Sequence, residues 1–423
     1  MKLQGLTVSQ AHQGLLKKEF SSVELCQSYL DRIKEKNEEI FAFLSINEET
    51  AIKQAKEVDD IINKGNDLPL LAGIPCAVKD NIMVEGLKCT AASKILENYI
   101  APYQATVIKK LRKEKAVILG KTNLDEFAMG ASGENSAFGP TKNPCDSSRV
   151  TGGSSSGSAA AVAADMAVFA LGSDTAGSIR YPASFCGIVG LKPTYGAVSR
   201  FGLIAMASSL DQIGPLTKNI DDCQIVFEAI RGKDGMDSTS VDMRVKSQGM
   251  KIKDLKIGVP KEYFIKGVDK EVERIIREAI KRYEAMGAKI MEVSLPHTDY
   301  AIATYYIIMP CEISANLARY DGIKYGYQNK EAGDLMQVYL KSRGKGLGDE
   351  VRRRIILGTY ALSSGYYDAY YLKAQKVRTL IRQDFEKVFR KVDVLMTPVS
   401  PITAFKLGEK IEDPLQMYLC DIF

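Results

Sequence analysis

The sequence of 423 residues predicts an α/β fold whose central sheet is largely parallel or mixed. Short apolar runs alternate with helix-forming segments from residue 73 onward, which is the pattern of a layered α/β protein. The composition, 45% hydrophobic and 26% charged, is that of an ordinary globular enzyme. The runs that we expect to form strands are 41–46, 73–78, 116–119, 166–171, 255–259, 289–293 and 392–396.

The segments around these runs read mainly as helices. The first seventy residues are helical apart from one short strand, and Ser21 or Ser22 can cap a helix that begins at Val23. The segment 330–391 is helical and ends in a charged stretch. The polar segment 232–254 is either a linker between domains or a surface excursion within one domain.

Composition excludes several classes of function. A formal charge of +5 is only mildly basic and falls well short of a dedicated nucleic-acid binder. No signal peptide is visible, and the longest apolar run is too short to span a membrane. The eight cysteines form no C-x-x-C pair, which predicts reduced thiols, no metal site and a cytoplasmic protein.

Two serine-bearing, glycine-rich loops carry the strongest functional signal: Thr-Gly-Gly-Ser-Ser-Ser-Gly-Ser (151–158) and Gly-Ser-Asp-Thr-Ala-Gly-Ser (172–178). An Ala-rich helix and a buried strand separate them. A helix of about ten residues rises roughly 15 Å, and a strand of five or six residues returns roughly 17–20 Å. We therefore expect the loops to lie side by side, with Ser154 near Ser178.

A serine nucleophile needs a base, and lysine is the best candidate. The two histidines, His12 and His297, have neither glycine-rich nor carboxylate-rich surroundings. Lys79 directly follows a buried strand, at the end where open α/β sheets place their sites. Burial disfavours the ammonium form and can bring its pKa toward neutrality. The alternative is a strand-end lysine that is solvated or paired with Asp80.

The second loop also suggests a site for a negative charge. Consecutive backbone N–H groups of Thr175, Ala176, Gly177 and Ser178 can converge as an oxyanion hole. Either loop alone could instead be a flexible turn or a phosphate cradle. A similar segment, Gly-Lys-Thr (120–122), is not the end of a Walker A loop, because Lys115 stands where that loop needs glycine.

These segments resemble the amidase signature family. The match consists of Gly-Ile-Pro-Cys-Ala-Val-Lys-Asp-Asn (73–81), the two serine loops, and Phe-Cys-Gly-Ile-Val-Gly-Leu-Lys-Pro-Thr-Tyr-Gly (185–196). The resemblance implies an amidase-signature fold, with a large mixed central β-sheet covered by helices on both faces. It also implies a triad in which Ser178 attacks an amide, Ser154 relays the proton after a cis peptide bond, and Lys79 is the base.

The resemblance further implies a single domain over residues 1–423. Its parts would be a helical region at 1–70, a signature core at 71–216, and the rest of the α/β domain at 217–423.

More specifically, the segments 124–139, 201–215, 320–326 and 354–370 resemble the A subunits of bacterial glutamyl-tRNA(Gln) amidotransferases. This resemblance implies a glutaminase in a heterotrimer with the B and C subunits. By this resemblance, the glutaminase would release ammonia and would need no cofactor of its own. The B subunit would use that ammonia, with ATP and Mg, to convert Glu-tRNA(Gln) to Gln-tRNA(Gln). Relatives of this kind continue for several tens of residues past Phe423, which implies a C-terminally truncated chain of lower stability.

The same resemblance assigns the glutamine pocket to Tyr305, Arg354 and Asp421. A guanidinium can clamp the α-carboxylate of glutamine, and Asp421 can pair with its α-ammonium. From the residues alone, Arg354 in its run of three arginines would read as part of a solvated helix face. Three other functions stay open: a stand-alone amidase for a small amide, a phosphate-binding or nucleotide-binding module, and an inactive scaffold.

Overall fold

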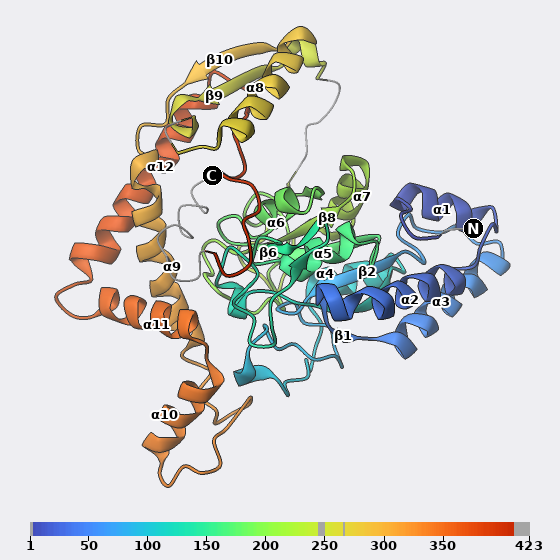
Figure 1. Cartoon of the computed structure of the whole chain (residues 1–423), viewed down its shortest axis with the longest axis horizontal. Coiled ribbons are helices and arrows are strands. Elements are labelled where there is room, and N and C mark those ends of the chain that lie inside the picture. The colour runs from blue at the N-terminus through green and yellow to red at the C-terminus, as the bar shows by residue number, and fades with distance from the viewer. Residues whose placement is uncertain (1–2, 244–249, 265–266, 410–423) are drawn as a thin grey trace. The chain divides into compact units, whose positions relative to one another are not determined.

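The computed structural model describes residues 3–243, 250–264 and 267–409 of the chain (Figure 1). It divides into two compact units, of which the first comprises Met1–Met243, Asn316–Arg352 and Lys406–Gly408. The second comprises Arg244–Ala315, Arg353–Phe405 and Glu409–Phe423. The boundary after Met243 falls within the polar segment that the sequence offered as a possible linker. The prediction of one domain over residues 1–423 stays a prediction.

A six-stranded mixed sheet organises the first unit, in the order β1-β3-β2-β6-β8-β7. The three strands β3, β2 and β6 are parallel to one another, while β1, β8 and β7 pair antiparallel with their neighbours. A separate antiparallel pair is formed by β4 and β5. The strands of this unit are β1 Phe43–Ile46, β2 Pro75–Lys79, β3 Val117–Thr122, β4 Lys142–Asn143, β5 Asp146–Val150, β6 Phe169–Asp174, β7 Val189–Gly190 and β8 Gln212–Thr217.

Helices surround this sheet. Ser21 caps the second of them, accepting a hydrogen bond from the N–H of Glu24 while the Glu24 side chain returns one to Ser21. The helices of this unit are α1 Val8–Leu16, α2 Ser22–Ile40, α3 Glu48–Asn63, α4 Thr106–Lys113, α5 Ser156–Ala163, α6 Arg180–Phe185, α7 Ile220–Ile230 and α10 Leu335–Gly346, with short 3₁₀ turns at Lys94–Leu96 and Glu126–Ala128.

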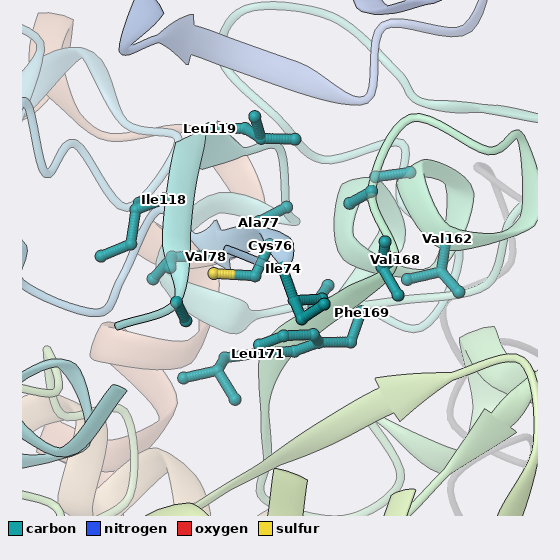
Figure 2. Packing of buried hydrophobic residues seen from close by; sticks show 14 of the residues in the cluster. Ile74, Cys76, Ala77, Val78, Ile118, Leu119, Val162, Val168, Phe169 and Leu171 are labelled. Atoms are coloured by element: carbon teal, nitrogen blue, oxygen red, sulfur yellow. The ribbon is translucent and has the colours of Figure 1, made fainter. Parts of the chain in front are cut away.

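The core of the first unit explains why the central strands read as continuous apolar runs. Every residue of β2, β3, β6 and β8 is buried, so both faces of the sheet are covered. Figure 2 shows side chains of three strands gathered with Val162 of α5: Cys76 and Val78, Ile118 and Leu119, and Phe169 and Leu171. Helix α5 is itself buried from Ser156 to Val162, as its alanine-rich sequence predicted.

The second unit contains a three-stranded parallel sheet in the order β10-β9-β11. Its strands are β9 Lys256–Pro260, β10 Lys289–Val293 and β11 Val394–Leu395. Its helices are α8 Lys270–Ala285, α9 Ala301–Leu317, α11 Asp349–Leu362 and α12 Lys373–Val388, with a π-helical turn at Asp368–Leu372 and 3₁₀ turns at Ile252–Asp254, Lys261–Tyr263 and Thr298–Tyr300. The unit boundary falls inside α9 and inside α11. Over the part of the chain that is described, no helix is long and apolar enough to cross a bilayer.

The predicted α/β class and mixed central sheet are confirmed, and each predicted strand exists. The three predicted strands at 255–259, 289–293 and 392–396 form the separate sheet of the second unit rather than joining the central one. The sequence did not predict β8, which pairs with β6 along six residues. Its Gly214 and Pro215 are typical of turns, and proline is rare inside a strand that has neighbours on both sides.

Candidate active site

Parallel pairing brings the two key segments of the site to one edge of the sheet. Lys79 is the last residue of β2, and β6 runs parallel beside it with Val78 opposite Leu171. The carboxyl ends of both strands therefore lie together, and the loop after β6 begins where Lys79 ends β2. This is the edge at which open α/β sheets place their functional residues.

The amine of Lys79 lies in a buried cluster of hydroxyl groups. Its Nζ is 2.8 Å from Ser154 Oγ and 2.9 Å from Ser155 Oγ. It also lies 3.0 Å from Ser173 Oγ and 3.2 Å from the Ser173 carbonyl oxygen. Lys79 and the serines at 154 and 155 are fully buried, so water does not compete for these contacts.

The hydrogen bonds around Lys79 fit a neutral amine. Ser155 Oγ donates to the Ser173 carbonyl over 3.1 Å, so toward Lys79 the Ser155 oxygen acts as an acceptor. The two N–H groups of a neutral amine can then bind Ser155 and Ser173. A lone pair is then left to accept a hydrogen bond from the third neighbour, the Ser154 hydroxyl. This arrangement lets Lys79 accept a proton from Ser154.

Electrostatics favour the same protonation state. Burial lowers the pKa of Lys79 to about 7, although the carboxylates of Asp125, Asp174 and Asp211 act in the opposite direction. Lys79 is not solvated, and the buried cation that pairs with Asp80 is Lys121, whose Nζ lies 2.8 Å from Asp80 Oδ1. The alternative of an ion pair between Lys79 and Asp80 is therefore wrong.

The peptide before Ser154 is held from both sides. The Gly153–Ser154 bond is cis. The N–H of Gly153 donates to the Ala131 carbonyl over 2.8 Å, and the N–H of Asp125 donates to the Ser154 carbonyl over 3.3 Å. The Asp125 carboxylate accepts the N–H groups of Gly133 and Asn135 at 3.1 Å and 2.9 Å, which ties the loop 131–135 to this peptide.

Position 153 should therefore tolerate only glycine. A methyl group there would overlap the Asp125 carboxylate and lie 2.8 Å from the backbone nitrogen of Gly133. We expect Gly153→Ala to displace Ser154 and abolish amide hydrolysis, with a loss of stability of about 1–3 kcal/mol from overpacking. Thermal unfolding and turnover of the purified variant test this. Gly235→Ala is the matched control because a methyl group there meets nothing within 4 Å, and equal activity of the two variants would contradict the expectation.

The loop that carries Ser178 is closed by Asp174 and Arg180. Asp174 Oδ2 accepts the N–H of Ile179 at 3.0 Å, and both carboxylate oxygens lie 3.2 Å from the Arg180 guanidinium. Burial alone would raise the pKa of Asp174, but Arg180 and the N–H of Ile179 hold it below its ordinary value. Arg180 Nη2 also donates to the Ala176 carbonyl over 2.6 Å, which fixes the peptide between Ala176 and Gly177.

The backbone of this loop presents N–H donors. The Ala176 and Gly177 carbonyls are bound by Arg180 Nη2 and by the N–H of Tyr181. Because N–H and C=O of a trans peptide point in opposite directions, the next N–H groups face away from those partners. Within the described residues, the N–H groups of 175–178 donate to no protein acceptor. Such donors can bind a developing oxyanion.

The two serine loops are in contact, as the lengths of the intervening helix and strand predicted. The N–H of Ser155, at the start of α5, donates to the Ser178 carbonyl over 3.0 Å. The structure therefore brings Lys79, Ser154 and the Ser178 loop together in one unit. The roles of the three residues, nucleophile, relay and base, stay predictions.

The residues predicted to form the glutamine pocket belong to other segments of the chain. Tyr305 and Arg354 belong to the second unit, and Asp421 lies outside the described residues. Arg354 is only 4% exposed and contacts Met309 Sδ at 3.5 Å, with its guanidinium 5.5 Å from the centre of the Tyr306 ring. The alternative of a solvated Arg354 is therefore wrong, while its role in binding glutamine stays a prediction.

The histidines have other settings. His12 is buried in α1 of the first unit. His297, in the second unit, lies with its Nδ1 2.8 Å from Asp384 Oδ2. No sequence pattern pointed to this carboxylate partner, which is 87 residues away along the chain. Among the described residues, neither ring hydrogen-bonds to Ser154 or Ser178.

Comparison with known proteins places the chain. The Amidase family model matches residues 24–423. The A subunit of the glutamyl-tRNA(Gln) amidotransferase of Desulforudis audaxviator is 56% identical, over 100% of this chain and 87% of that protein. The protein of the same name from Caldanaerobacter subterraneus is 57% identical, over 100% of this chain and 87% of that protein. The crystal structure of the corresponding protein from Thermotoga maritima has a TM-score of 0.81 at 44% identity, covering 100% of this chain and 85% of that one. The chain belongs to the amidase family, in the group that contains the A subunits of glutamyl-tRNA(Gln) amidotransferases.

Proposed function

We propose that this chain is the glutamine-hydrolysing subunit of a tRNA-dependent amidotransferase and that it uses Ser178, Ser154 and Lys79. The observation that carries the mechanism is the buried Lys79 amine, 2.8 Å from Ser154 Oγ and beside the Ser178 loop. The choice of glutamine as substrate is supported by the A subunits of the amidotransferases, which are similar to this chain along its whole length.

The reaction begins when Ser178 Oγ attacks the side-chain amide carbon of glutamine. The Ser178 proton passes to Ser154 Oγ as Ser154 gives its own proton to Lys79. Negative charge develops on the amide oxygen, where the N–H groups of the 175–178 stretch bind it. As the C–N bond breaks, Lys79 returns the proton through Ser154 to the leaving nitrogen, and ammonia departs. Water then hydrolyses the γ-glutamyl ester by the same relay and releases glutamate.

The remaining parts of the proposal concern the substrate's polar ends and the partners. Arg354, Asp421 and Tyr305 would hold the α-carboxylate and α-ammonium of glutamine. In a cytoplasmic heterotrimer, the B subunit would use the released ammonia on Glu-tRNA(Gln), with ATP and Mg bound there, and the C subunit would brace the pair. The names of the similar proteins support membership of an amidotransferase.

The proposal is tested by mass spectrometry after brief exposure to glutamine, with the partner subunits present. We expect a γ-glutamyl adduct on the peptide that contains Ser178 and none in the Ser178→Ala variant. An adduct on another residue, or turnover without any adduct, would refute the covalent mechanism. Hydrolysis of small amides but not glutamine would instead indicate a stand-alone amidase.

A further inference from the structure

Asp211 is a buried carboxylate that the proposed mechanism does not yet use. It is 3% exposed and lies in the segment 201–215, directly before β8. The antiparallel pairing of β8 with β6 ends with Gln212 opposite Asp174. One step further along this register, Asp211 comes opposite Thr175, the first residue of the proposed oxyanion stretch. Strand pairing therefore delivers this carboxylate to the site.

The carboxylate of Asp211 binds two different segments, and its Oδ1 accepts from both, since the N–H of Ala207 also donates to Oδ1 over 3.2 Å. Thr175 Oγ1 donates to Asp211 Oδ1 over 2.7 Å. The N–H groups of Met206 and Ala207 donate to Asp211 Oδ2 over 2.8 Å and 3.1 Å. Hydrogen bonds to a charged acceptor are stronger than those between neutral groups, so Asp211 is a firm link between Thr175 and the 206–207 backbone.

The turn on the far side of this link is anchored independently of Thr175. Asn316 Nδ2 donates to the Met206 carbonyl over 3.1 Å, and Tyr195 Oη donates to the Ser208 carbonyl over 2.8 Å. Arg200 also donates to the Ser208 carbonyl and forms an ion pair of 2.8 Å with Asp237. Asp211 thus holds Thr175 against a fixed turn.

We propose that Asp211 is a positioning residue for the oxyanion stretch, which it holds in place through the Thr175 hydroxyl. The inference rests on the proposed function. Arg180 and Tyr181 fix the middle of the loop through the carbonyls of Ala176 and Gly177, and Asp211 fixes its beginning. With the beginning and the middle of the loop held, the N–H groups keep their orientation while charge develops on the amide oxygen.

The test measures the rate of acylation in Thr175→Val, Thr175→Ser and Asp211→Asn in the assembled enzyme. The valine variant keeps the shape of threonine and removes only the donor to Asp211. We expect kcat to fall about 10-fold to 100-fold, less than complete removal of an oxyanion donor costs, with KM nearly unchanged. Thr175→Ser restores the hydroxyl and should recover most of the rate. Rates are compared at about pH 9, because Asp211→Asn also changes the charge near Lys79.

A double-mutant cycle and a matched control separate positioning from general stability. If Asp211 acts through Thr175, the variant with both Thr175→Val and Asp211→Asn should be no slower than Asp211→Asn alone. Thr106→Val removes a comparable hydrogen bond outside the oxyanion stretch, from Thr106 Oγ1 to Asp234 Oδ2 over 2.6 Å, and is expected to lower the melting temperature while leaving kcat unchanged.

Four results would overturn the proposal: a normal kcat in Thr175→Val, no recovery in Thr175→Ser, additive losses in the cycle, or an equal loss of kcat in Thr106→Val. A wild-type enzyme that hydrolyses no glutamine would refute the proposed function instead.

Discussion

Replacing Ser178 by alanine is expected to abolish glutamine-dependent amide transfer while ammonia-dependent transfer continues. Without the Ser178 oxygen no acyl-enzyme can form, and loss of a serine nucleophile costs on the order of 10⁶ in kcat. Free ammonia bypasses this step, because the amidation of Glu-tRNA(Gln) is assigned to the partner subunit. The measurement compares Gln-tRNA(Gln) formation by the assembled enzyme with glutamine and with ammonium chloride as the nitrogen donor.

The control for this experiment is Ser184→Ala. Ser184 is an exposed serine of the helix α6 that follows the nucleophile loop. Its replacement should leave both activities intact. Equal loss of both activities in Ser178→Ala would contradict the assignment, since it would mean that the substitution damages assembly or folding rather than the glutaminase step.

Replacing Lys79 by methionine is the second change with a large expected effect. Methionine fills most of the space of the lysine stem but has no amine to accept the Ser154 proton. Positioned general-base catalysis contributes about 10²–10⁴ in rate, and here two serines depend on one base. We therefore expect glutamine hydrolysis to fall by at least about 10³-fold. Near-normal turnover would exclude Lys79 as the base.

The same variant should change how stability depends on pH. Burial lowers the folded-state pKa of Lys79 to about 7, whereas an unfolded lysine titrates near 10.4. Between these values the unfolded state binds the extra proton, so the free energy of unfolding rises as pH increases from about 7 to about 10. Lys79→Met removes this contribution. Urea unfolding at several pH values tests the expectation. The control is Lys53→Met, which replaces an exposed lysine of helix α3. An unchanged pH slope in Lys79→Met would contradict it.

Much of the central sheet was predictable because its strands are buried on both faces. Continuous apolar runs such as 73–78 and 166–171 are bounded by turn residues and are too short for a typical buried helix, so they predict strands. The sequence did not predict which strands pair with one another. The strands of the second unit read like those of the first, and nothing in their periodicity says that they form a sheet of their own. Strand β8 was missed because Gly214 and Pro215 obscure its pattern.

The candidate site was predictable where its residues lie in motifs. Lys79 at a strand end and two serine loops flanking a buried helix are local features. The residues that surround them depend on contacts between distant segments. Ser173 reaches Lys79 because β6 pairs with β2, and Asp211 reaches Thr175 because β8 pairs with β6. Asp125 hydrogen-bonds to the Ser154 carbonyl because the chain between them folds back on itself. None of these contacts has a signature in a single sequence.

The central claim is that a neutral, buried Lys79 accepts the proton of Ser154 while Ser154 takes the proton of Ser178. The most direct measurement is the pH dependence of ammonia release in a single turnover, with the assembled enzyme in excess over glutamine. Release should be slow at low pH, rise tenfold per pH unit as Lys79 loses its proton, and level off above a midpoint near the Lys79 pKa of about 7. A rate that is independent of pH across this range, or one that still rises at pH values where a solvated lysine titrates, would contradict the account.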